Sequence, residues 1–258
     1  MNGDDKKLIS HSRHLVAFMA SVTRKWRVTQ TLIVGRYPEI RADELADAGF
    51  RVCTESLYFS VIHDLAALLF DEGRKTPSLA TCLQILSQSV VERRLRNHYV
   101  ASASGDYEGQ QRFRDEFDIA VRRLREGIPA VLEFGDATAC RRARDKYVAH
   151  FSLSGEGKYS MQLKIQHFGL LLDTPNRLIK RLLPVLDDLS LITGNTLFAW
   201  DAHAEENEQI STQLAIGFRG EAGVIPDIED LIEQFEPVPH AQPSVFNVLM
   251  HTSRDDDE

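Results

Sequence analysis

Apolar residues that recur every three or four positions over long segments are the feature that most limits what this chain can fold into. The clearest case runs from Ser56 to Phe70, where one stripe consists of Leu57, Val61, Leu65 and Leu68. Such spacing places side chains on one face of an α-helix. Further stripes predict helices over residues 8–34, 41–48 and 113–124. Four or five long helices with short polar connections predict an all-α bundle.

Local signals predict where several of these helices begin. Thr76 and Pro77 have the order of a capping residue followed by a first-turn proline, which is typical of a helix start. The helix that follows should reach about Asn97. The Thr-Pro pair at positions 174 and 175 predicts a second start of the same kind, for a helix that Pro184 should kink.

Two residues predict a helix break between positions 124 and 141. Gly127 is expected to end the helix of residues 113–124, because glycine is common just beyond a helix C-terminus. Pro129 is then expected to open the next helix, which carries the segment Arg141–His150.

The pattern changes beyond His150. Alternation of apolar and polar residues predicts a short strand through Tyr159, Met161, Leu163 and Ile165, although the sequence offers no obvious partner strand. We therefore expect a helical bundle over residues 1–195. Residues 196–258 are expected to form an irregular, partly helical acidic extension that packs on the bundle or on a dimer.

The formal net charge of −8 gives the chain as a whole no basic surface for nucleic acid. The charge is uneven, however, because residues 92–146 contain 12 Lys and Arg against 10 Asp and Glu. The sequence therefore permits a nucleic-acid partner at one local patch without requiring it.

Cysteine usage and short motifs narrow the chemistry. Cys53, Cys82 and Cys140 lack close pairing, which argues against a disulfide framework or a zinc knuckle. There is no H-E-x-x-H motif and no glycine-rich phosphate loop, so no metal or cofactor is expected. No apolar run approaches the roughly 18 residues of a membrane span, and the first residues do not resemble a signal peptide. A cytoplasmic protein without membrane contact is the expectation.

The segment Arg141–His150, R-R-A-R-D-K-Y-V-A-H, combines four cations, one carboxylate and an imidazole. On a straight helix Arg144 and His150, six positions apart, would point about 120° away from each other. They can therefore meet only in one of three ways. The helix breaks near His150, the long Arg144 side chain swings round, or a second copy of the chain completes the site.

An arginine followed by a histidine after four to six residues resembles the signature of the HEPN superfamily. The chain has two such pairs, Arg93 with His98 and Arg144 with His150. Asp145, directly after the second arginine, is the polar residue that the family pattern prefers. The sequence R-D-K-Y-V-A-H resembles the motif of the abortive-infection (AbiU-like) branch of this superfamily. The stretch F-D-E-G-R-K-T-P-S-L, residues 70–79, looks like that branch's helix-ending aspartate followed by a Ser-Leu helix start.

The resemblance covers roughly residues 8–195 and implies a metal-independent endoribonuclease active in phage defence or as a toxin. It implies His150 as the acid and base, Arg144 as the phosphate stabiliser and Asp145 as an orienting residue. Arg141 and Lys146 would bind the RNA backbone. In this superfamily two motifs usually meet across a homodimer, and an antitoxin or another defence protein would be a natural partner.

A structural interpretation has comparable weight. Cations in a last turn are stabilised by the helix dipole, and His150 could cap the final carbonyls. The chain would then be a non-catalytic HEPN-type module that dimerises or binds RNA, a nucleotide or a partner protein. Arg93 and His98 are expected to be a solvated helix end, and His63 a buried core histidine. Asp71 is expected to act in capping, with an ion pair between helices as an alternative.

Overall fold

The computed structural model of the protein describes residues 3–34, 44–71, 73, 76–101, 107–148, 165–194 and 197–219. One compact unit spans Met1–Ala215. Every regular element in the described residues is helical and none is a strand, which confirms the all-α bundle. The expected strand at residues 159–165 falls outside the described residues except for Ile165, which begins a short helical turn. Residues 220–258 of the expected acidic extension also lie outside them.

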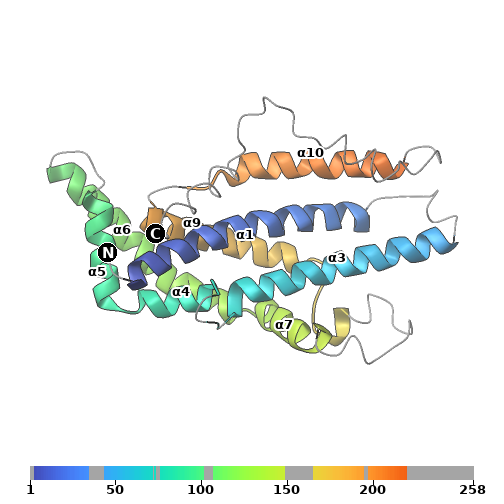
Figure 1. Cartoon of the computed structure of the whole chain (residues 1–258), viewed down its shortest axis with the longest axis horizontal. Coiled ribbons are helices and arrows are strands. Elements are labelled where there is room, and N and C mark those ends of the chain that lie inside the picture. The colour runs from blue at the N-terminus through green and yellow to red at the C-terminus, as the bar shows by residue number, and fades with distance from the viewer. Residues whose placement is uncertain are drawn as a thin grey trace, which may run out of the picture. The chain divides into compact units, whose positions relative to one another are not determined.

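Within the described residues, the main elements are eight α-helices and one π-helical turn (Figure 1). They are α1 (Gly3–Val34), α3 (Glu44–Phe70), α4 (Leu79–Leu86), α5 (Ser89–Ala101), α6 (Tyr107–Leu132), α7 (Gly135–Ala143), η1 (Arg144–Val148, the π turn), α9 (Thr174–Gly194) and α10 (Trp200–Arg219). Helix α1 packs on both α3 and α9, α6 packs on α9, and α7 lies along the C-terminal half of α3 (Figure 1).

The long stripes predicted from the sequence form the core between these helices. Helix α3 contributes Val61, Leu65 and Leu68, all with no exposed surface, while Leu57 is only half-buried. Helices α1, α6 and α9 contribute further fully buried side chains, among them Leu8, Leu15, Met19, Phe117, Leu124, Leu182 and Leu186. The same core also takes in buried side chains of α4, α5 and α7. Because these helices share one core, they are fixed by apolar packing rather than by their own helix propensity.

Helix α3 is apolar over most of its length. Among the described helices it alone is long and apolar enough to cross a membrane, by length and composition, and half of its most apolar stretch is buried inside the protein. Core helices commonly meet the same criteria. Helix α3 contacts both α1 and α7.

The helix predicted to start at Thr76 begins instead at Leu79. It is divided into two helices, α4 and α5. Ser78 is the N-cap, because its backbone is extended and its side chain accepts a hydrogen bond from the Thr81 N–H. Helix α4 then ends at Leu86, where the Ser87 hydroxyl donates to the Gln84 carbonyl at 2.7 Å. A side chain that competes for backbone partners in this way favours a helix end, so α5 begins anew at Ser89.

The predicted break at Gly127 and Pro129 is wrong. Helix α6 passes through both residues and ends at Leu132. A Cβ at Gly127 would lie 3.2 Å from Cγ2 of Val185, so the glycine permits close approach of α6 to α9 instead of ending a helix. Packing against α9 therefore outweighs the local cost of a proline within the helix.

The second Thr-Pro pair is confirmed as a helix start. Helix α9 begins at Thr174, whose hydroxyl accepts a hydrogen bond from the Leu171 N–H at 2.9 Å. Pro184 lies inside this helix. The kink expected at Pro184 stays a prediction.

Candidate functional site

The Arg144 segment lies where α7 changes from α-helical to π-helical geometry. Arg144 is the C-cap of α7, and residues 144–148 form the π turn η1. Single π turns inside helices are rare and occur frequently at functional sites. Because the α-helix ends at Ala143, the angle of about 120° expected between Arg144 and His150 on a straight α-helix does not hold here. His150 itself lies outside the described residues.

The start of α7 is fixed to α9 by charge and by aromatic contact. The Asp136 carboxylate, which is nearly buried, accepts from the Arg177 guanidinium at 2.6 Å. The Arg181 guanidinium lies 4.1 Å from the ring centroid of Phe134, just before the helix. Removing Arg177 would leave the nearly buried Asp136 carboxylate without its cation, which is costly although Arg177 itself is 38% exposed. The contacts therefore give α7 a defined direction, and α7 carries Arg144 towards α3.

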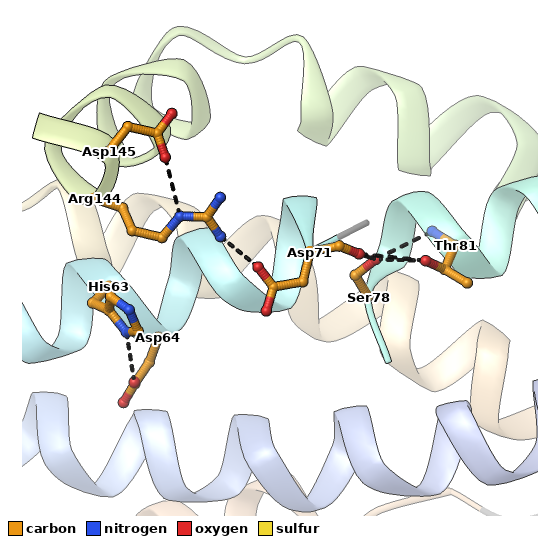
Figure 2. A network of polar contacts seen from close by, with 7 residues as sticks. All are labelled: His63, Asp64, Asp71, Ser78, Thr81, Arg144 and Asp145. Atoms are coloured by element: carbon orange, nitrogen blue, oxygen red, sulfur yellow. Dashed lines mark hydrogen bonds and ion pairs between the residues drawn. The ribbon is translucent and has the colours of Figure 1, made fainter. Parts of the chain in front are cut away.

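Arg144 is held by two carboxylates (Figure 2). Its Nη1 donates to Oδ1 of Asp71 at 2.6 Å, and its Nε lies 3.3 Å from Oδ1 of Asp145. The Arg144 side chain is 21% exposed and that of Asp71 34% exposed. The pair joins η1 to the C-terminal end of α3, so the inter-helix ion pair considered for Asp71 is present.

Asp71 is itself held in place by the start of α4. Its carbonyl accepts from the buried Ser78 hydroxyl at 2.6 Å, and the Thr81 hydroxyl lies 3.4 Å from the same oxygen. Figure 2 shows Ser78 and Thr81 beside the Asp71 backbone while the Asp71 carboxylate points towards Arg144. The Ser-Leu helix start and the helix-ending aspartate are therefore parts of one structure that positions the arginine.

Three other residues expected at the site, Arg141, Asp145 and Lys146, are described and are exposed around Arg144. Arg141 lies on α7 with its guanidinium carbon 5.2 Å from the ring centroid of Phe70, which fixes its direction by a cation–π contact. Asp145 and Lys146 lie in η1, and both are exposed. Arg141, Arg144 and Lys146 thus give the end of α7 a cluster of cations that a phosphodiester could contact.

The buried residues of α7 offer no nucleophile. Cys140 has no exposed surface, and burial, with a smaller contribution from Asp136, raises the pKa of its thiol well above its usual value. A thiol that stays protonated is a poor nucleophile and a poor metal ligand. Among the residues that the structure describes, no group of three or more His, Cys, Asp and Glu could hold a metal ion.

His63 is exposed, so its expected role as a buried core histidine is wrong. Its side chain is 46% exposed on α3, and Nδ1 lies 3.6 Å from Oδ1 of Asp64. Asp64 also accepts from Lys25 at 2.5 Å. His63 was misassigned because it stands next to the buried Ile62, and only the packing of α1 on α3 decides which neighbour faces inwards. Figure 2 shows His63 on α3, the helix that ends directly before Asp71.

Arg93 and His98, the second arginine–histidine pair, occupy a regular helix. Both lie on α5 and both are exposed, in agreement with the solvated helix end expected for them. The neighbouring Arg94 instead pairs with Asp5, which has no exposed surface, at 2.8 Å. The two pairs in the chain therefore differ in structure although their spacing is similar.

Comparison with known proteins agrees with the arrangement of these parts. A HEPN family model described as AbiU2 matches residues 5–214. No curated protein and no solved structure matches the chain. The matched span includes the core helices, the turn with Asp71 and Ser78, and the Arg144 segment. Since the match covers well over half of the chain, the protein belongs to the AbiU2 family of HEPN proteins.

Proposed function

We propose that the protein is a metal-independent endoribonuclease of the HEPN type, in which Arg144 and His150 act at a homodimer interface. The proposal rests on one observation about Arg144. Its Nη1 lies 2.6 Å from Oδ1 of Asp71, which fixes the guanidinium, while 21% of the side chain stays exposed. The contacts to Asp71 and Asp145 use Nη1 and Nε. The Nη2 group can therefore be offered to a phosphate oxygen in a fixed direction.

The substrate in this proposal is RNA, and the reaction is an internal transfer. His150 accepts the proton of a ribose 2′-OH, whose oxygen attacks the adjacent phosphorus. The bond from phosphorus to the 5′-oxygen breaks, and this oxygen takes a proton from an imidazolium. The products are a 2′,3′-cyclic phosphate and a 5′-OH. Arg144 stabilises the negative charge of the phosphorane, while Arg141 and Lys146 bind the RNA backbone.

A homodimer completes the site in this proposal because each copy would bring one Arg144 segment to the other. Cleavage of this kind suits a role in phage defence or as a toxin, held in check by an antitoxin or a defence partner. We further propose a cytoplasmic location without membrane contact. The three cysteines are free thiols, as is usual in a reducing compartment.

RNA cleavage in EDTA tests the proposal directly. The wild type should cut single-stranded RNA in EDTA, and Arg144→Ala and His150→Ala should each reduce the rate by roughly 100-fold or more. His98→Ala is the matched control, because it removes an exposed histidine of the second pair, and it should cut like the wild type. Equal cleavage by all four proteins, or none with any RNA class, would rule out the nuclease.

Mixing variants tests whether the site is shared between subunits. Alone, Arg144→Ala and His150→Ala should each cut RNA at no more than about 1% of the wild-type rate. If Arg144 of one subunit works with His150 of the other, a mixed dimer has one intact site. After exchange about a quarter of the wild-type rate should return, since half of the dimers are mixed. No recovery in a mixture that demonstrably exchanges subunits would show that each subunit acts alone.

A second candidate function is a non-catalytic HEPN-type module that binds RNA, a nucleotide or a partner protein. The ion pair of Arg144 with Asp71 within one chain favours it, because a neutralised guanidinium attracts a phosphate less strongly. The net charge of −8 also favours it. This candidate predicts RNA or partner binding that Arg144→Ala weakens, with no cleavage by the wild type under any condition.

A further inference from the structure

Helix α10 is the least closely packed of the described helices. Every other described helix approaches at least one neighbour closely along its backbone, whereas α10 makes no extensive approach of this kind. Figure 1 shows α10 on the outside of the bundle, alongside α1. A cavity of about 250 Å³ remains between α10, α1 and α9, and its walls include Trp26, Leu183 and Trp200. The attachment of α10 to the bundle therefore depends on side chains that reach across, rather than on interlocking helix surfaces.

The face of α10 that meets the bundle is mostly polar. Asn207 and Ser211 are buried, and the side chain of His203 is largely buried. Apolar side chains join them only near the two ends, at Trp200 and Leu214. In α6, by contrast, every buried residue is apolar. Because apolar burial supplies most of the tertiary stabilisation of a helix, α10 should be held less firmly than α6.

Ion pairs and hydrogen bonds make the attachment of α10 to α1. Nη2 of Arg24 lies 3.0 Å from Oε2 of Glu206, and Nε of Arg24 donates to Oδ1 of Asn207 at 3.1 Å. Arg27 pairs with Glu208, and the side chains of both ion pairs are 40–54% exposed. Pairs this exposed are screened by salt, since the Debye length falls from about 8 Å at 0.15 M to about 3 Å at 1 M. High salt should therefore weaken the attachment of α10 without weakening the apolar core.

The two ends of α10 are attached differently. Trp200 packs against the main core, and its indole N–H donates to Asp187 at 2.7 Å. Leu214 instead packs on a separate and smaller apolar cluster of α1 and α3. The N-terminal end is therefore the firmer one, and detachment of α10 should begin at its C-terminal end.

We propose that α10 is a releasable cover, which detaches from α1 and unfolds while the rest of the bundle stays folded. Release uncovers the cavity walls on α1 and α9, which include Trp26 and Leu183. It also frees Arg24 and Arg27 from their carboxylate partners, so the open form presents two cations near an indole ring. A helix of 20 residues is marginal by itself in water, so detachment exposes the amides of α10 to exchange. Local opening of this kind is typical of weakly packed elements.

Hydrogen exchange of the full-length protein, followed by mass spectrometry of its peptides, tests the proposal. At 0.15 M NaCl the amides of α10 should exchange at least about 100-fold faster than those of α9, relative to their unfolded rates. Raising NaCl to 1 M should speed up exchange in α10 about tenfold further and leave α9 unchanged. Synthetic peptides of residues 174–194 and 200–219 give the unfolded rates at each salt concentration.

Reversing one charge locates the contact. Glu206→Arg places a cation beside Arg24 and should speed up exchange in α10 about tenfold. Glu205→Arg is the matched control, because it makes the same change at an exposed residue on the side of α10 opposite His203 and Asn207. It should exchange like the wild type. Combining Glu206→Arg with Arg24→Glu rebuilds the ion pair in reverse and should restore most of the protection.

The results that overturn the proposal are equally defined. Equal protection of α10 and α9 at both salt concentrations, or a variant that speeds up α6 as much as α10, would mean that α10 opens only with the whole bundle. Exchange in α10 that does not respond to salt, or equal effects of Glu206→Arg and Glu205→Arg, would mean that charge does not hold the helix. No RNA enters the measurement, so its outcome does not depend on the nuclease activity.

Discussion

The chain contains two arginine–histidine pairs of similar spacing that differ in structure. In α5, Arg93 and His98 face solvent on a regular helix. After α7, Arg144 stands at the start of a π turn and is fixed by Asp71, the residue that follows α3. The comparison teaches that spacing alone does not define a site. What separates the two is whether the tertiary structure holds the guanidinium in one direction.

The largest effect should come from changing the shape of the two arginines while keeping their charge. Arg144→Lys replaces a planar fork that contacts two carboxylates by a single ammonium group. We expect RNA cleavage to fall roughly 100-fold. Arg93→Lys, the same change on α5, should leave the rate unchanged. Initial rates on one labelled RNA decide this, and an equal loss in both variants would contradict the comparison.

The next effect concerns the carboxylates that pair with arginine in each region. Asp5 is fully buried beside Arg94. The substitution Asp5→Asn should therefore lower the free energy of unfolding by about 3 kcal/mol. Asp71 is 34% exposed beside Arg144, so Asp71→Asn should lower the free energy of unfolding by only about 1 kcal/mol. Urea denaturation measures both. Asp71→Asn should nevertheless lower RNA cleavage, while a stability loss larger than that of Asp5→Asn would make Asp71 mainly structural.

A smaller effect is expected where α3 meets α4. Ser78 has no exposed surface, accepts from the Thr81 N–H and donates to the Asp71 carbonyl. Ser78→Ala should therefore lower the free energy of unfolding by about 1–2 kcal/mol. Ser87→Ala, at an exposed hydroxyl, is the control and should cost less than about 0.5 kcal/mol. Denaturation midpoints compare them, and equal costs would show that Ser78 does not act as a cap.

The smallest effect is a difference in pH dependence between two histidines. His11 is 6% exposed, and burial, with smaller contributions from Lys7 and His14, lowers its pKa from the model-compound value of 6.5. The unfolded chain then binds the proton more readily than the folded one. His11 should therefore reduce stability as the pH falls below about 6.5.

Replacing each histidine tests this sign. His11→Asn should flatten the dependence of the free energy of unfolding on pH between about 7 and 5. His98→Asn, at an exposed residue of α5, should leave the slope as it is in the wild type. A slope that is the same in all three proteins would mean that the His11 imidazole does not contribute.

Much of the bundle could be predicted from the sequence because its stripes are long and consistent. The stripe of residues 56–70 predicted the core half of α3, and the Thr-Pro pair at 174 predicted the start of α9. Thr76 was wrong as a cap, because Ser78 two residues later satisfies both Asp71 and Thr81. Competing capping residues so close together differ only in their tertiary partners.

The site could be predicted in part. The sequence singled out Arg144, Asp145, Arg141 and Lys146, which lie together at the end of α7. Arg144 and Asp71 are 73 positions apart, and no local pattern specifies their pairing. The sequence therefore favoured a capping role for Asp71 and offered an ion pair between helices only as the alternative. A cavity that both tryptophans line was not predicted, because Trp26 on α1 and Trp200 on α10 are far apart in the chain.

By itself the sequence determined that the chain is helical and that a cationic segment closes one helix, because both follow from the order of neighbouring residues. Only the tertiary structure decided that α6 continues through Gly127, that His63 faces solvent and that Asp71 fixes Arg144. The physical reason is that these outcomes depend on which helix packs against which. The free energy of such contacts is shared between residues that are distant in the chain.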